Sequence, residues 1–142
     1  MENKYKELLI RDLCARLPYG VIVETTKGKG HVCDINLTIF GYEFGVNVNP
    51  TIRDNFSIND VKPYLFPFSS ITSEQLFEVQ EILGKNEIEI GDGFLHIIDS
   101  DRNTITYLEI LALLEWFYKN HFDIYGLIPK GLALDATGLN IY

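Results

Sequence analysis

Apolar and polar positions follow two different periods along the chain, and each change of period marks an expected element. Residues 107–120 contain no Gly or Pro, and their apolar side chains recur at the three- and four-residue spacing of a helix. Its expected buried face holds Ile110, Leu114, Phe117 and His121. Thr106 and Glu109 stand where a capping box would begin this helix. The sequence predicts a core helix here, around which the other segments pack.

Two further helices are expected. Residues 2–17 place Leu8, Leu9 and Leu13 on one broad face, and Pro18 ends the pattern. A second capping box, Thr72 to Gln75, begins a helix that runs to about residue 83.

Strict alternation of apolar and polar residues predicts strands in the first third of the chain. Residues 21–24 and 33–39 alternate on either side of the glycine-rich turn at 26–30, which is typical of a hairpin. The alternation changes parity near Gly41, so we expect a turn or bulge there and three antiparallel strands between about 20 and 48. Residues 87–98 predict either a second hairpin or one strand followed by a loop.

The segment 61–72 carries large apolar side chains and two prolines. Pro63 and Pro67 argue against a regular helix or a central strand, so we expect an extended segment pinned to the body. Neighbouring side chains of an extended segment point to opposite sides, so some should anchor it while others face outward. The candidate interface residues are Tyr64, Phe66, Phe68 and Trp116. Trp116 interrupts the polar side of the long helix, where it is either covered by another segment or exposed for a partner.

Together these elements predict a single α+β domain over residues 1–142. A small antiparallel sheet, built from a hairpin or meander, would be covered on one face by about three helices. A chain of 142 residues is long enough to bury a substantial core.

Charge and composition exclude several classes of function. The formal net charge of −8 opposes phosphate binding, so we expect no nucleic-acid partner. No apolar run reaches the roughly 20 residues that cross a bilayer, and the N-terminus lacks a signal-peptide pattern, so we expect a cytoplasmic protein without membrane contact. Two cysteines, Cys14 and Cys33, do not make a disulfide framework.

Candidate chemistry is sparse. Lys27, Gly28, Lys29 and Gly30 form the one basic, glycine-rich loop, which can offer ammonium and amide groups to a phosphate but lacks the spacing of a nucleotide-binding loop. His121 lies near a helix end, where it is either a buried core histidine or a ligand-binding or acid–base residue. His31 and Cys33 share a strand face while Asp34 points away, so we expect no metal site. We expect no cofactor, and we can name no catalytic residue.

Three stretches resemble a family of short, uncharacterised proteins of gut bacteria and their phages and prophages. They are LLIRDLCARLPYGV (8–21), VKPYLFPFSSIT (61–72) and EWFYKNHFDIYGLIPKGLAL (115–134), in the same order as in that family. The family pattern has a basic residue where this chain has Phe66, which is why Phe66 is the expected outward-facing side chain. The family has no assigned activity, so the resemblance implies a phage-associated or accessory setting and supplies no catalytic residues.

The functional hypothesis is a non-enzymatic binding protein whose partner is a protein or a small ligand. The alternative is a small enzyme that acts on a phosphorylated or nucleotide-like substrate through the Lys27–Gly30 loop and His121. Whether the chain forms a homo-oligomer stays open from sequence.

Overall fold

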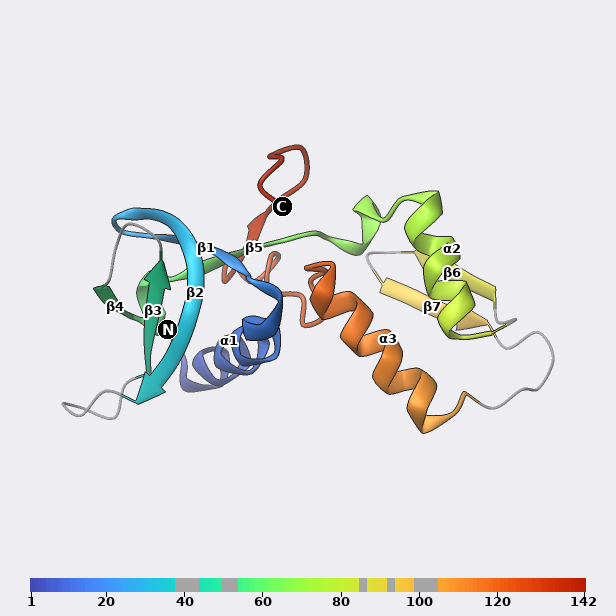
Figure 1. The fold of residues 1–142 in the computed structure, drawn as a ribbon, viewed down its shortest axis with the longest axis horizontal. Helices are drawn as coiled ribbons and strands as arrows, with labels where there is room; N and C mark the ends of the chain where they lie inside the picture. Colours follow the sequence, from blue (N-terminus) through green and yellow to red (C-terminus); the bar gives the residue numbers. More distant parts are fainter. Residues whose placement is uncertain (38–43, 50–53, 85–86, 92–93, 99–104) are drawn as a thin grey trace.

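The computed structural model describes residues 1–37, 44–49, 54–84, 87–91, 94–98 and 105–142 (Figure 1). Its α-helices are α1 (Asn3–Arg16), α2 (Ser73–Ile82) and α3 (Tyr107–Lys119). Its strands are β1 (Ile22–Thr25), β2 (Gly28–Leu37), β3 (Phe44–Asn49), β4 (Asp54–Ser57), β5 (Lys62–Leu65), β6 (Glu87–Gly91), β7 (Phe94–Ile98) and β8 (Leu134–Asp135). Three single turns of 3₁₀ helix cover Leu17–Tyr19, Ile58–Asp60 and Phe68–Ser70.

Six of these strands form one sheet in the order β4-β3-β2-β1-β5-β8. All neighbouring pairs are antiparallel except β5 and β8, which run parallel. The remaining strands, β6 and β7, pair with each other as an antiparallel hairpin. The predicted α+β class, with a small and mostly antiparallel sheet, is confirmed, as are the first three strands. Of the two alternatives for residues 87–98, the structure shows the hairpin. The parity change expected near Gly41 lies outside the described residues.

The buried side chains divide between two clusters. The six-stranded sheet with α1 and the hairpin with α2 lie on opposite sides of the molecule in Figure 1, and α3 extends from the second toward the first. The first cluster packs α1 against the six-stranded sheet and includes Leu9, Leu13, Val23 and Val46. The second packs α2 and α3 with β6 and includes Val79, Ile88, Leu113 and Phe117. Only α1 of the three helices therefore contributes to the core of the large sheet, and α2 and α3 enclose a core of their own.

The buried face of α3 differs from the predicted one. Leu113 and Phe117 are buried, whereas Ile110 is exposed and Leu114 only half-buried. The helix carries more apolar positions than its neighbours can cover, so packing against α2 selects the stripe that enters the core. Both predicted capping boxes are present, with Thr106 and Thr72 each accepting from the amide three residues later.

β5 is a central strand, so the expectation that Pro63 excludes one is wrong. Successive residues of a strand direct their backbone groups to opposite sides. The Tyr64 carbonyl faces β1, where it accepts from the Tyr142 hydroxyl, and the Leu65 carbonyl faces β8, where it accepts from the Ala136 amide. The missing N–H of Pro63 thus falls on the β8 side, just before that ladder starts at Tyr64. No ladder bond on that side is lost to the proline.

A buried ion pair joins the two clusters. Asp12 and Arg16 are one helical turn apart on α1, and both are fully buried. The guanidinium meets the carboxylate through two bonds of 2.8 Å, from Nε to Oδ2 and from Nη2 to Oδ1. Arg16 also donates to the carbonyl oxygens of Phe122, at 2.6 Å, and Tyr118, at 3.4 Å, where α3 ends. One α1 side chain therefore caps the C-terminus of α3, where a positive charge is favoured.

The chain leaves α3 through a helix-terminating turn centred on His121. The His121 amide donates to the Tyr118 carbonyl, and the Phe122 amide donates to the Phe117 carbonyl, which is the hydrogen-bond pattern of a Schellman motif. His121 has φ +59°, at the position where this motif usually has glycine. Asp123 then fixes the next turn, because its carboxylate accepts from the amides of Leu127 and Ile128. These turns bring the C-terminal residues back onto the six-stranded sheet.

Candidate functional site

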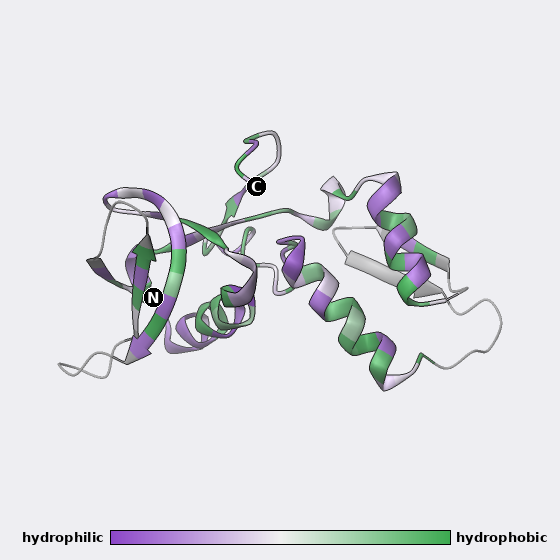
Figure 2. Cartoon of the chain, in the orientation of Figure 1, coloured by the Kyte–Doolittle hydropathy of each residue, from purple (hydrophilic) through white to green (hydrophobic). Residues whose placement is uncertain are grey.

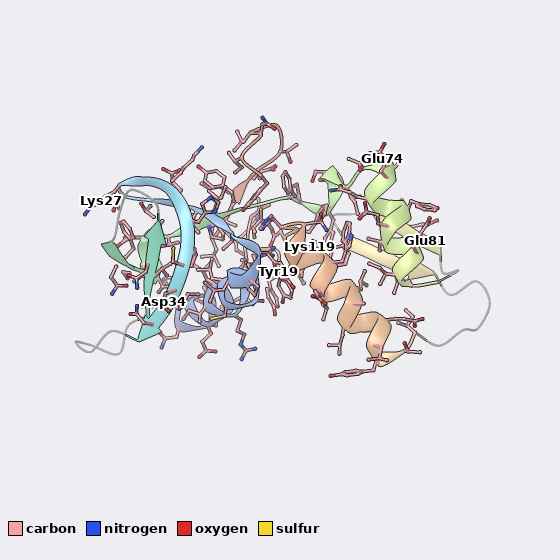
Figure 3. The ribbon with its side chains drawn as sticks, in the orientation of Figure 1. Tyr19, Lys27, Asp34, Glu74, Glu81 and Lys119 are labelled. Atoms are coloured by element: carbon pink, nitrogen blue, oxygen red, sulfur yellow. The ribbon has the colours of Figure 1, made fainter. Side chains whose placement is uncertain are left out.

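The basic glycine-rich loop is the two-residue turn between β1 and β2. Thr25 pairs with Gly28, and its buried hydroxyl donates to the Gly28 carbonyl at 2.7 Å and accepts from the Lys27 amide. Gly28 has φ +119°, a conformation that only glycine adopts readily. Lys27 lies at the tip of this turn (Figure 3). Lys29 lies on β2 opposite Glu24. The turn therefore separates the two lysines rather than gathering them into a phosphate loop.

A small open pocket lies beside this hairpin. It has a volume of about 230 Å³ and is lined by Ile22, Lys29, Gly30, His31 and Ile141. The structure thus brings Lys29 and Gly30 of the predicted loop together with residues of β1 and the C-terminal segment. Lys27 and Gly28 do not line it. This pocket is one candidate site, and we refer to it as the hairpin pocket.

The polar groups of the hairpin pocket are held in place by their neighbours. The Lys29 ammonium lies 4.8 Å from the centre of the Tyr64 ring, and the Tyr64 hydroxyl donates to Glu24 at 2.6 Å. Burial, followed by this hydrogen bond, raises the pKa of Tyr64 to about 12. The His31 Nδ1 atom lies 3.0 Å from the Gly20 carbonyl oxygen. Because a carbonyl can only accept, Nδ1 carries the proton and Nε2 remains available to a ligand.

The Tyr142 side chain bridges strands β1 and β5 where their direct pairing ends. β1 and β5 pair at Val23–Pro63, and the next pair would be Ile22 with Tyr64. The Tyr142 hydroxyl stands between them instead, accepting from the Ile22 amide at 3.2 Å and donating to the Tyr64 carbonyl at 2.7 Å. Burial raises the pKa of Tyr142 to about 12, so the hydroxyl keeps the proton that it donates.

His121 lies under the Tyr142 ring, not in an open cleft. The two rings stack with centres 3.8 Å apart, and the His121 Nδ1 atom is buried without a hydrogen-bond partner among the described residues. Burial, with smaller contributions from Arg16 and His31, lowers the pKa of His121 to about 4. The imidazole is therefore neutral at pH 7 and shielded from substrate. This placement does not favour the enzyme alternative, which requires His121 to face an open site near the Lys27–Gly30 loop.

The four candidate interface residues lie largely in contact with the protein itself. Tyr64 is buried, and Phe66, which we expected to face outward, is half-buried with its ring against Phe122 and Tyr142. Phe68 packs edge-on against Phe117. Trp116 stacks on Phe122, and its indole N–H donates to Glu78 of α2 at 2.9 Å. The covered alternative for Trp116 thus fits its position.

The largest exposed apolar side chains of α3 lie elsewhere on the helix, in its first half. Tyr107 and Leu108 are 74% and 75% exposed, and Ile110 and Leu111 are each 43% exposed. Figure 2 shows hydrophobic colouring along this half of α3, which lies away from α1 and the six-stranded sheet (Figure 1). We call these four residues the α3 apolar surface. The sequence did not single them out, because an apolar position on an amphipathic helix is ordinarily assigned to the core.

The candidate metal ligands on β2 do not converge. The register of β2 shifts between Val32 and Asp34, so a bulge at Cys33 overturns the strict alternation expected there, and Cys33 is exposed. No group of three or more His, Cys, Asp or Glu side chains in the described ranges could hold a metal ion. Within the same ranges, no helix has the length and apolar character required to cross a membrane.

Comparison of the chain with protein-family models, with curated proteins and with solved structures gave no match. The resemblance to proteins of gut bacteria and phages therefore remains an expectation from the sequence.

Proposed function

We propose that this protein is a non-enzymatic binding protein that holds a partner protein on the α3 apolar surface. The observation that supports the proposal is the exposure of four large apolar side chains within five residues of one helix. Single exposed apolar residues are ordinary on protein surfaces, but clusters of them are typical of interaction sites. A partner that covers them would gain the free energy of removing this apolar area from water.

Charge favours a different protein over a second copy as the partner. The chain has a formal net charge of −8, and α3 itself carries Glu109 and Glu115. Two copies would repel each other, whereas a partner with basic residues beside an apolar segment would complement this surface. The expected phage-associated or accessory setting directs the search for that partner to the native cell.

Site-specific photo-crosslinking tests the proposal. A photoreactive amino acid is placed at Leu108 in one variant and at Leu139 in another, and each variant is expressed in the native cell. Leu139 is the matched control because it is also an exposed apolar residue, 47% accessible, but lies in the C-terminal segment. We expect one discrete adduct from position 108 and none from position 139. Mass spectrometry then identifies the partner.

A double substitution, Leu108→Glu with Leu111→Glu, provides the second arm. It should abolish co-purification with the protein identified at position 108, while the melting temperature stays within about 2 °C because both side chains are exposed. Equal adducts at both positions, or an adduct made only with a second copy of this chain, would contradict the proposal.

A further inference from the structure

The hairpin pocket has a chemical character unlike that of the chain as a whole. The chain is acidic, with a formal net charge of −8, yet the two charged or titratable side chains that line the pocket are Lys29 and His31. An anion entering here meets an ammonium group and no carboxylate among the residues that line the pocket.

Lys29 has no carboxylate partner among the described residues. Glu24 lies opposite Lys29 across the β1–β2 ladder, but its carboxylate accepts a hydrogen bond from the Tyr64 hydroxyl, with 2.6 Å between the two oxygens. The Lys29 ammonium instead lies over the Tyr64 ring, 4.8 Å from its centre. A cation over an aromatic face retains hydrogen-bonding capacity for a ligand, because the ring contributes attraction without accepting all three N–H bonds.

The rest of the pocket is apolar or backbone. Ile22 and Ile141 form its apolar sides, and Gly30 contributes only main-chain atoms. Its volume of about 230 Å³ is below the roughly 300–1,000 Å³ of pockets that hold drug-sized ligands. An occupant therefore has space for one ring or a short aliphatic chain.

We infer that the hairpin pocket binds a small organic anion, with its phosphate or carboxylate group at Lys29 and its apolar body between Ile22 and Ile141. Lys29 supplies a charge-assisted hydrogen bond. The Nδ1 proton of His31 is engaged by the Gly20 carbonyl, so Nε2 can accept a hydrogen bond from a hydroxyl or N–H group elsewhere on the ligand. This site is separate from the α3 apolar surface, so it can be occupied whether or not that surface binds a partner.

Titration followed by NMR tests the inference on the full chain. Phenyl phosphate and benzoate are the two anionic probes, and benzamidine, a cation with the same ring, is the control ligand. We expect saturable shifts at the amides of Ile22, Gly30 and His31 with at least one anion and none with benzamidine. The stronger of the two anions identifies the preferred head group. Equal binding of benzamidine, or no saturable shift at millimolar concentration of either anion, would overturn the inference.

Two lysine variants separate a specific contact from general electrostatics. Lys29→Met and Lys27→Met change the net charge equally and keep the aliphatic stem, but only Lys29 lines the pocket. Lys29→Met should weaken binding of the preferred anion by about tenfold, the loss expected when one hydrogen bond to a charged group is removed. Lys27→Met should stay within about twofold, because an exposed charge outside the site is screened by salt. Equal losses in the two variants would show that net charge alone attracts the probe.

Discussion

Removing one partner of the Asp12–Arg16 ion pair should destabilise the protein more than most single substitutions. Both side chains are fully buried, and the guanidinium has Asp12 as its only carboxylate partner among the described residues. Asp12→Ala leaves the positive charge with only the carbonyl oxygens of Phe122 and Tyr118. The nearby carboxylate of Asp123 is already engaged by two amides, so it is poorly placed to substitute.

The expected cost of Asp12→Ala is about 3–5 kcal/mol, the range for leaving one charge of a buried pair uncompensated. A domain of this size has a total stability of roughly 5–15 kcal/mol, so the variant would lose a large part of it. Arg16→Met should cost a similar amount, because it leaves Asp12 buried and removes the cap from the end of α3. The double variant Asp12→Leu with Arg16→Met should lose less than either single variant, since neither charge of the pair is then left buried without its partner.

Urea denaturation of the wild-type protein and the three variants measures these free energies. The exposed ion pair Lys4–Glu2, at 3.2 Å with side chains 70% and 67% exposed, provides the control. Glu2→Gln should change stability by less than about 0.5 kcal/mol. An Asp12→Ala variant as stable as Glu2→Gln would refute the reasoning, because it would mean that the pair is hydrated in solution.

Three further predictions concern the other contacts described above. Leu113→Ala should lower the free energy of unfolding by about 2–5 kcal/mol and Leu111→Ala by less than about 0.5 kcal/mol, because only Leu113 is buried. Equal urea midpoints for the two variants would contradict the assigned buried face of α3. Tyr142→Phe should lower the free energy of unfolding by about 0.5–1.5 kcal/mol and speed hydrogen exchange at the Ile22 amide, because that amide loses its acceptor. An unchanged exchange rate would mean that the Tyr142 hydroxyl does not bond to this amide. Between pH 6.5 and about 4 the unfolded chain protonates His121 and the folded chain does not, so stability should fall as pH is lowered through this window. His121→Asn, which tolerates the positive φ, should lack this part of the pH dependence, and parallel profiles would argue against a buried neutral imidazole.

The elements that depend on local sequence were predictable. Both capping boxes begin helices at the expected residues, because a side-chain oxygen three residues from its amide partner forms this bond without tertiary help. The glycine-rich turn joins β1 and β2, since few residues other than glycine tolerate its backbone conformation. Part of the hairpin pocket was visible in the same way, because Lys29 and Gly30 are among the first residues of β2, directly after that turn.

The spacing of α1 also contained a signal that the sequence reasoning did not use. Leu9, Asp12, Leu13 and Arg16 recur at three- and four-residue intervals, so the ion pair lies on the same face as two core leucines. A carboxylate and a guanidinium on an apolar face are expected to pair with each other. The capping of α3 by Arg16 was not visible, because the carbonyls that the guanidinium reaches are more than one hundred residues away.

Tertiary structure alone decided which of several apolar surfaces is covered. Helix α3 has apolar residues around much of its circumference, and contact with α2 buries Leu113 and Phe117 while Leu108 remains in water. Pro63 occupies a central strand because its missing N–H falls just before the β8 ladder begins, a matter of register between distant segments. The sequence thus determines which conformations a segment can adopt locally. Packing against distant segments of the chain, which no local pattern identifies, determines which face of the segment is buried.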